Sequence, residues 1–232
     1  MIENRVDRIP DLVTLRRVII SVYDKTGLEN LVTSLMAQQK DLEIYSTGGT
    51  YRACEKILGD SAKEHLYRIS DYTGQPEMHG GLVKTLDFRI YLGLLSEPFS
   101  PVHQDDLKRG SALAMDMVVV NLYPFREVVS AVENDSENAR SNIDIGGPCM
   151  LRAAAKNFIR VTAVNDPSDY PLILAEMAAK NGAVSLKTRF RMAVKAFEQT
   201  ASYDTSIVAY LSGVDPEVFK TVYTLEEGEY HG

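Results

Sequence analysis

Met117-Val118-Val119-Val120-Asn121-Leu122 has the pattern of a strand that is buried on both faces. Continuous β-branched runs of this kind are typical of parallel sheets, whose two faces are covered by helices. Shorter runs of the same character lie at residues 18–22 and 161–164. Two further strands are expected at 42–45 and 66–69.

Helical patterns separate these strands, at residues 28–36 and near 51–58. Beyond about residue 167 the pattern is entirely helical, with helices expected at 168–179 and 185–211 and an acidic tail after them. Alternating strands and helices predict an α/β fold, with an open, mostly parallel sheet and helices on both faces. Such sheets bind ligands at the carboxyl ends of their strands.

The composition is that of an ordinary soluble globular protein, with 232 residues, 45% of them hydrophobic and 25% charged. The net charge of -7 and the absence of a basic block argue against a nucleic-acid partner. No apolar run is long enough to span a membrane and no signal peptide is visible, so a cytoplasmic location is expected. The two cysteines, Cys54 and Cys149, imply no disulfide framework, and the histidine and cysteine spacing suggests no zinc site.

Two loops that follow predicted strands are rich in residues that bind phosphate. Asp24-Lys25-Thr26-Gly27 follows the first strand, and Ser46-Thr47-Gly48-Gly49-Thr50 follows the second. Each loop opens a helix, where free backbone N–H groups and the positive end of the helix dipole attract anions. Either loop alone is a weak signal, but two on neighbouring strands favour a phosphorylated ligand.

A third region combines a carboxylate, a glycine turn and two cations. In the stretch 142–157, Asp144 precedes Gly146-Gly147-Pro148, and Pro148 suits the first position of a helix. Arg152 and Lys156 lie four residues apart and therefore share one face of that helix. A lysine beside a second cation and partly removed from water gives up its proton more readily, as acid/base catalysis requires. The ordinary alternative is a helix cap followed by a solvated cationic face.

The motifs occur in an order that resembles the IMP cyclohydrolase domain, the N-terminal half of the bifunctional purine enzyme AICAR transformylase/IMP cyclohydrolase. The resemblance covers residues 16–211, which leaves an N-terminal extension at 1–15 and an acidic C-terminal tail at 212–232. It implies the methylglyoxal-synthase-like variant of the open α/β sheet. The motifs that carry it are 21–27, 46–50, 76–78, 83–86, 121–125 and 142–157, with later matches at 166–170 and 196–204.

The resemblance implies the last step of purine biosynthesis, ring closure of formyl-AICAR ribotide to inosine monophosphate with loss of water. It implies a homodimer that acts on a purine ribonucleotide and needs neither a metal nor an organic cofactor. Lys156 matches the acid/base lysine of the family, and Lys84, Tyr123 and Asp144 match its other catalytic residues. The positions that match nucleotide-binding residues are Asp24, Lys25, Thr47, Gly48, Gly49, Thr50, Thr85, Asn121 and Ile145.

The chain departs from the family pattern at several positions near Lys84. Leu82 replaces an arginine, Asp87-Phe88 replaces a His-Pro pair, Tyr91 replaces a histidine and Tyr23 replaces a serine. Leu82 removes a positive charge and Asp87 adds a negative one, and both changes are expected to weaken anion binding. The transformylase half is absent from the sequence, so a separate transformylase is expected to supply the substrate.

Three functions are compatible with these features. Retention of Lys84, Tyr123, Asp144 and Lys156 favours the cyclohydrolase. The changes at Leu82 and Asp87 favour a non-catalytic module that binds purine nucleotides for regulation. A phosphate-eliminating enzyme of the same fold, such as a methylglyoxal synthase, is less well supported, because the motifs near 121 and 142 belong to the cyclohydrolase pattern and fold alone does not determine function.

Overall fold

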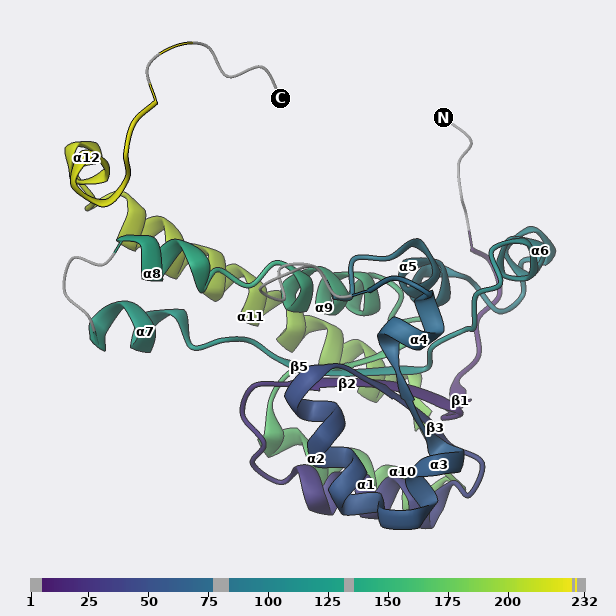
Figure 1. Cartoon of the computed structure of the whole chain (residues 1–232). Helices are drawn as coiled ribbons and strands as arrows, with labels where there is room; N and C mark the ends of the chain where they lie inside the picture. The colour runs from purple at the N-terminus through teal and green to yellow at the C-terminus, as the bar shows by residue number, and fades with distance from the viewer. Residues whose placement is uncertain (1–5, 77–83, 132–135, 227, 229–232) are drawn as a thin grey trace. The chain divides into compact units, whose positions relative to one another are not determined.

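The computed structural model describes residues 6–76, 84–131, 136–226 and 228 (Figure 1). The chain divides into two units, which are described separately. Unit 1 comprises Met1–Leu122 and Ile145–Thr200, and unit 2 comprises Tyr123–Asp144 and Ala201–Gly232. The boundaries expected from the sequence at 16 and 211 stay a prediction.

Unit 1 contains the parallel sheet that the sequence predicts. Its strand order is β4-β3-β2-β5-β6, and every neighbouring pair is parallel. Val18 of the central strand lies opposite Ile44 on one side and Met117 on the other. The five strands are β2 (Arg17–Val22), β3 (Glu43–Ser46), β4 (Leu66–Arg68), β5 (Met117–Asn121) and β6 (Thr162–Val164).

Helices cover both faces of this sheet, as expected (Figure 1). One face carries α1 (Leu28–Gln38), α2 (Gly48–Leu58) and α10 (Tyr170–Ala179), and the other carries α5 (Phe88–Leu95) and α9 (Gly146–Lys156). Alternate side chains of β2 point to opposite faces, so the strand contributes to both layers of the core.

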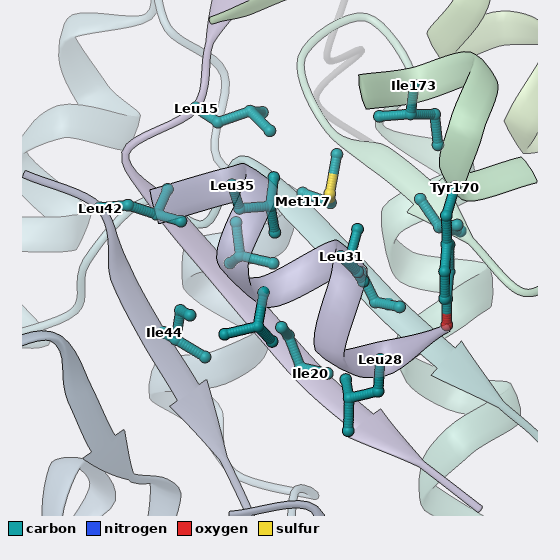
Figure 2. Close-up of a cluster of buried hydrophobic side chains, with 14 of the residues drawn as sticks. Leu15, Ile20, Leu28, Leu31, Leu35, Leu42, Ile44, Met117, Tyr170 and Ile173 are labelled. Carbon is teal, nitrogen blue, oxygen red and sulfur yellow. The ribbon is translucent and has the colours of Figure 1, made fainter. Parts of the chain in front are cut away.

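The core on the α1 face is built from leucine, isoleucine and valine side chains (Figure 2). Leu28, Leu31 and Leu35 recur at helical spacing on α1 and are at most 2% exposed. They pack with Ile20 of β2 and Ile173 of α10. This packing fixes the starts of α1 and α2 at the carboxyl edge of the sheet, where the two predicted phosphate loops lie.

A second, two-stranded sheet was not predicted from the sequence. β1 (Leu12–Thr14) pairs antiparallel with β7 (Ala183–Ser185). The expectation that the chain is entirely helical beyond residue 167 is therefore wrong, and α11 (Leu186–Leu211) starts one residue later than expected. Each strand has only three residues, too few for alternation to be visible in the sequence.

A buried arginine joins this small sheet to the rest of unit 1. The guanidinium of Arg189 donates to the carbonyl oxygens of Pro10 (2.7 Å), Asp11 (2.9 Å) and Val184 (2.6 Å). Burial lowers the pKa of Arg189 to about 10. Five hydrogen bonds to backbone carbonyls satisfy the guanidinium, and the charges of Asp11 and Glu176 also favour its charged form, so the side chain can be completely buried.

Unit 2 is helical, and α8 (Ser136–Ser141) packs against α7 (Phe125–Ala131) and α12 (Phe219–Val222). The end of α11 and a short turn, η4 (Pro216–Val218), belong to the same unit. The tail thus contains a short helix, as expected. The remaining elements of unit 1 are η1 (Gly59–Ser61), α3 (Ala62–His65), α4 (Ile69–Thr73), α6 (Pro101–Arg109) and η3 (Pro167–Asp169). Among the described residues, no helix is both long and apolar enough to cross a membrane.

Candidate functional site

The loop after β2 is held in shape by its own side chains. The carboxylate of Asp24 accepts hydrogen bonds from the N–H (2.9 Å) and the hydroxyl (2.7 Å) of Thr26. These bonds, with a smaller contribution from the charge of Lys25, lower the pKa of Asp24. Asp24, which we expected to contact a nucleotide, is therefore engaged in forming the turn that leads into α1.

Asn121 fixes the same loop from the end of β5. Its Oδ1 accepts from the backbone N–H groups of Tyr23 (2.7 Å) and Asp24 (3.0 Å), and its Nδ2 donates to the carbonyl of Asp24 (2.8 Å). The exposed ammonium of Lys25 reaches back to the carbonyl of Tyr23 (3.3 Å). The structure thus uses the carboxamide of Asn121 to shape the loop that carries Lys25, and both lie where two parallel strands end.

The loop after β3 is tied to β2 in a similar way. The buried hydroxyl of Thr50 accepts from the N–H of Val22 (3.0 Å) and donates to its carbonyl (2.9 Å). Thr47 lies beside Ser21, with 3.4 Å between their hydroxyl oxygens. Gly48 has a φ of 47°, a conformation that favours glycine. Thr50 therefore shapes the loop, while the first N–H groups of α2 lack partners within the helix and face the carboxyl edge of the sheet.

Lys84 and Thr85 connect this loop to the start of α9. A Cβ atom on Gly48 would lie 3.6 Å from the Nζ of Lys84, so the ammonium lies beside the loop. A Cβ atom on Gly146 would lie 2.7 Å from the Oγ1 of Thr85, a distance too short for a real contact. Glycine at 146 therefore allows buried Thr85 to approach the first turn of α9.

Lys156 lies at the opposite end of α9 from this cluster. Gly146 and Lys156 are the first and last residues of the helix, which places them about 15 Å apart at 1.5 Å per residue. Lys156 is exposed, so the partial removal from water that we expected is not seen in the chain alone. Arg152, on the same face, lies with its guanidinium carbon 5.5 Å from the centre of the Phe197 ring. Pro148 is the third residue of the helix rather than the first, but it still lies in the first turn, where a backbone N–H would have no partner within the helix.

Tyr123 and Asp144 belong to unit 2. Tyr123 is 47% exposed and precedes α7, so it is not a core aromatic residue. The backbone N–H of Asp144 donates to the hydroxyl oxygen of Tyr203 (2.7 Å). Tyr203, on α11, was not predicted as a site residue, because the sequence gives no sign of which hydroxyl its loop contacts. Ile145, the residue that precedes α9, is 53% exposed in unit 1.

The departures at Tyr23, Asp87-Phe88 and Tyr91 lie among the described residues, and Phe88 and Tyr91 are on α5. Asp87 is the N-cap of α5, where its carboxylate accepts from the N–H of Arg89 (2.8 Å). Its charge is thus partly neutralised by the helix rather than presented alone to an anion. Tyr23 is 52% exposed, and Asn121 holds its backbone. Leu82 lies outside the described residues.

The two cysteines are free thiols, and Cys54 is buried. Burial raises the pKa of the Cys54 thiol to about 11, so it is not a reactive nucleophile at neutral pH. Cys149 is also a free thiol, on α9. No group of three histidine, cysteine or acidic residues within the described ranges is arranged to hold a metal ion.

Known proteins resemble this chain over most of its length. Residues 27–149 match the MGS-like domain, and residues 154–230 match the AICARFT/IMPCHase bienzyme. The bifunctional purine biosynthesis protein PurH of Neisseria meningitidis serogroup A / serotype 4A is 42% identical over 217 residues, which are 94% of this chain and 39% of that protein. PurH of Ruminiclostridium cellulolyticum is 44% identical over 197 residues, which are 85% of this chain and 37% of that protein.

A solved structure, described as the crystal structure of ForH, superposes with a TM-score of 0.72 at 30% sequence identity. The match covers 86% of this chain and 100% of the ForH chain. The chain spans less than two fifths of the PurH proteins, 37% to 39% of their length. From the family match and these relatives, the chain belongs to the MGS-like domain family and matches the part of PurH that includes the IMP cyclohydrolase domain.

Proposed function

We propose that this chain is an IMP cyclohydrolase, which closes the six-membered ring of formyl-AICAR ribotide. The observation that carries the proposal is the position of Lys84 and Thr85, between the glycine loop at Gly48 and the start of α9 at Gly146. Two helix N-termini and a lysine then meet at the carboxyl edge of a parallel sheet, where such folds bind phosphorylated ligands. Similarity to PurH supports the choice of substrate.

In the proposed complex, the phosphate binds at the starts of α1 and α2. Lys25 supplies a positive charge, and Thr47, Gly48 and Gly49 supply a hydroxyl and backbone N–H groups. Asp24, Thr50 and Asn121 act indirectly, by holding the two loops in place. Thr85 and Ile145 lie on the path from the phosphate loops to the start of α9.

In the proposed reaction, the carboxamide nitrogen of the substrate attacks the formyl carbon. A C–N bond forms, the formyl oxygen takes up negative charge, and the nitrogen loses a proton. The Lys84 ammonium stabilises that charge, and Tyr123 and Asp144 orient the weakly nucleophilic carboxamide. The oxygen takes up two protons, one of them from Lys156, and leaves as water when its bond to the formyl carbon breaks. In the same step the formamide nitrogen loses its proton and forms the C=N double bond of the new ring. For Lys156 to reach the leaving oxygen, the heterocyclic ring of the bound substrate must extend from the phosphate loops along α9.

The proposal is tested by incubating the purified chain with formyl-AICAR ribotide and following inosine monophosphate by its ultraviolet absorbance, without added metal. We expect turnover well above the uncatalysed rate. Tight binding of inosine monophosphate without turnover would instead support a second candidate, a regulatory module that binds purine nucleotides. The distance of Lys156 from the Lys84 cluster favours that second candidate.

We also propose that the chain forms a homodimer. In unit 1, Phe190, Val194 and Phe197 recur at helical spacing on α11 and are 53%, 43% and 39% exposed. An exposed apolar stripe of this kind is typical of a subunit interface. Light scattering is expected to give twice the chain mass of 25.8 kDa.

A further inference from the structure

Tyr203 contacts the segments that carry both proposed orienting residues of unit 2. Its hydroxyl oxygen accepts from the backbone N–H of Asp144 at 2.7 Å and donates to the carbonyl of Asn142 at 3.5 Å. Its ring packs edge-on against Phe125, with 6.3 Å between ring centres. Phe125 follows Tyr123 by two residues and is 1% exposed. One side chain of α11 therefore contacts both the segment with Tyr123 and the segment with Asp144.

The hydroxyl of Tyr203 is suited to hold a backbone turn. The side chain is 6% exposed, and burial raises the pKa of its hydroxyl, which therefore stays protonated at neutral pH. A protonated hydroxyl can accept and donate at the same time, as it does here with Asp144 and Asn142. Both bonds go to main-chain atoms, so they fix the path of the loop on each side of Ile143.

We infer that Tyr203 is a positioning residue, which sets the location of the Asp144 carboxylate relative to Tyr123 for the ring closure. This inference rests on the proposed function. Small displacements of an orienting group lower turnover more than binding, because alignment of the reacting atoms matters most in the transition state. The phosphate loops belong to unit 1 and share no hydrogen bond with Tyr203 among the described residues, so substrate binding is expected to change little.

The test compares Tyr203→Phe with Tyr210→Phe. Tyr210 lies on the same helix and packs edge-on against the same ring of Phe125 at 5.8 Å, but its hydroxyl has no hydrogen-bond partner in the described part of the chain. We expect Tyr203→Phe to lower kcat about tenfold, the scale of one lost hydrogen bond, with KM within about twofold of wild type. Tyr210→Phe is expected to keep kcat within about twofold.

A double-mutant cycle separates positioning from a general effect on folding. If Tyr203 acts through Asp144, adding Tyr203→Phe to Asp144→Asn lowers kcat no further, because the carboxylate that the hydroxyl positions has gone. If the two substitutions lower kcat by factors that multiply in the double variant, the inference is overturned. It is also overturned if the wild-type chain is active and Tyr203→Phe leaves kcat unchanged. A wild-type chain without turnover would overturn the proposed function itself, and the role of Tyr203 with it.

Discussion

At the scale of single residues, several polar groups that the sequence places near a ligand are used within the protein. The hydroxyl of Thr50 bonds both backbone groups of Val22, and the carboxamide of Asn121 bonds the loop at residues 23–24. The sequence predicts that such residues lie at the carboxyl edge of the sheet, which they do. It cannot predict which partner each side chain bonds, because that depends on how neighbouring strands bring the loops together.

The two lysines assigned to different roles give the sharpest test at this scale. We expect Lys156→Ala to lower kcat by about 10²-fold or more, the usual scale of acid/base catalysis, while nucleotide still binds. Lys25→Ala is expected mainly to raise KM, because its proposed partner is a phosphate in ground and transition states alike. Lys56→Ala, at an exposed lysine in the last turn of α2, is the control. Equal, small effects of both lysine changes would contradict the assignments.

At the scale of elements, long strands and periodic helices could be predicted from the sequence, and very short strands could not. The five-residue strand β5 and the periodic helix α1 are found where they were expected. The three-residue strands β1 and β7 were missed, because their pairing depends on Arg189 and on residues far apart in sequence. The alternation of strands and helices predicted parallel strands with helices on both faces, but it did not predict the strand order β4-β3-β2-β5-β6.

The hydrogen bonds of Asn121 are expected to hold the loop that follows β2. Asn121→Asp replaces the Nδ2 donor by an oxygen, which would then face the carbonyl of Asp24 at about the present 2.8 Å. We expect the loop to open, with faster hydrogen exchange at the amides of Tyr23 and Asp24 and a raised KM. Asn30→Asp, on an exposed turn of α1, is the control. Unchanged exchange at both amides would show that the carboxamide does not hold the loop.

The junction between α10 and α11 is expected to respond to acid. Burial disfavours the charged form of Glu176, but hydrogen bonds from Lys180, Ser185 and Thr188 outweigh that effect and lower its pKa to about 2. Because this pKa is below the ordinary value of 4.5, the carboxylate stabilises the fold above pH 4.5, and the gain is lost as the pH falls towards 2.

The measurement is the free energy of unfolding in urea at pH 6 and pH 3. Glu176→Gln is expected to reduce the difference between the two values by on the order of 1–2 kcal/mol. Glu55→Gln, on the exposed face of α2, is the matched control and is expected to leave the difference unchanged. If Glu176→Gln loses as much free energy of unfolding between pH 6 and pH 3 as wild type does, other groups cause the acid response.

At the scale of the whole molecule, the chain consists of two units, and the proposed site residues are distributed over both. Unit 1 contains the phosphate loops, Lys84 and Lys156, and unit 2 contains Tyr123, Asp144 and Tyr203. The sequence motifs predicted all of these residues except Tyr203 as one set, because motif order carries no information about how a chain divides. The same limit applies to the segment 1–15, expected as an extension, whose residues 10–14 contact β7 and Arg189.

Removing residues 1–14 is therefore expected to destabilise the protein strongly. The deletion leaves β7 without its only partner strand in the described sheets and deprives the buried guanidinium of Arg189 of two carbonyls, those of Pro10 and Asp11. Hydrogen bonds to a charged group contribute about 1.5–3 kcal/mol each, so the loss is about 3 kcal/mol or more, a large part of a typical domain's stability. A chain that lacks only residues 1–5 keeps every contact named here and is the control. Urea denaturation measures both, and equal midpoints for the two deletions would show that β1 and the Arg189 contacts contribute little to the stability of the fold.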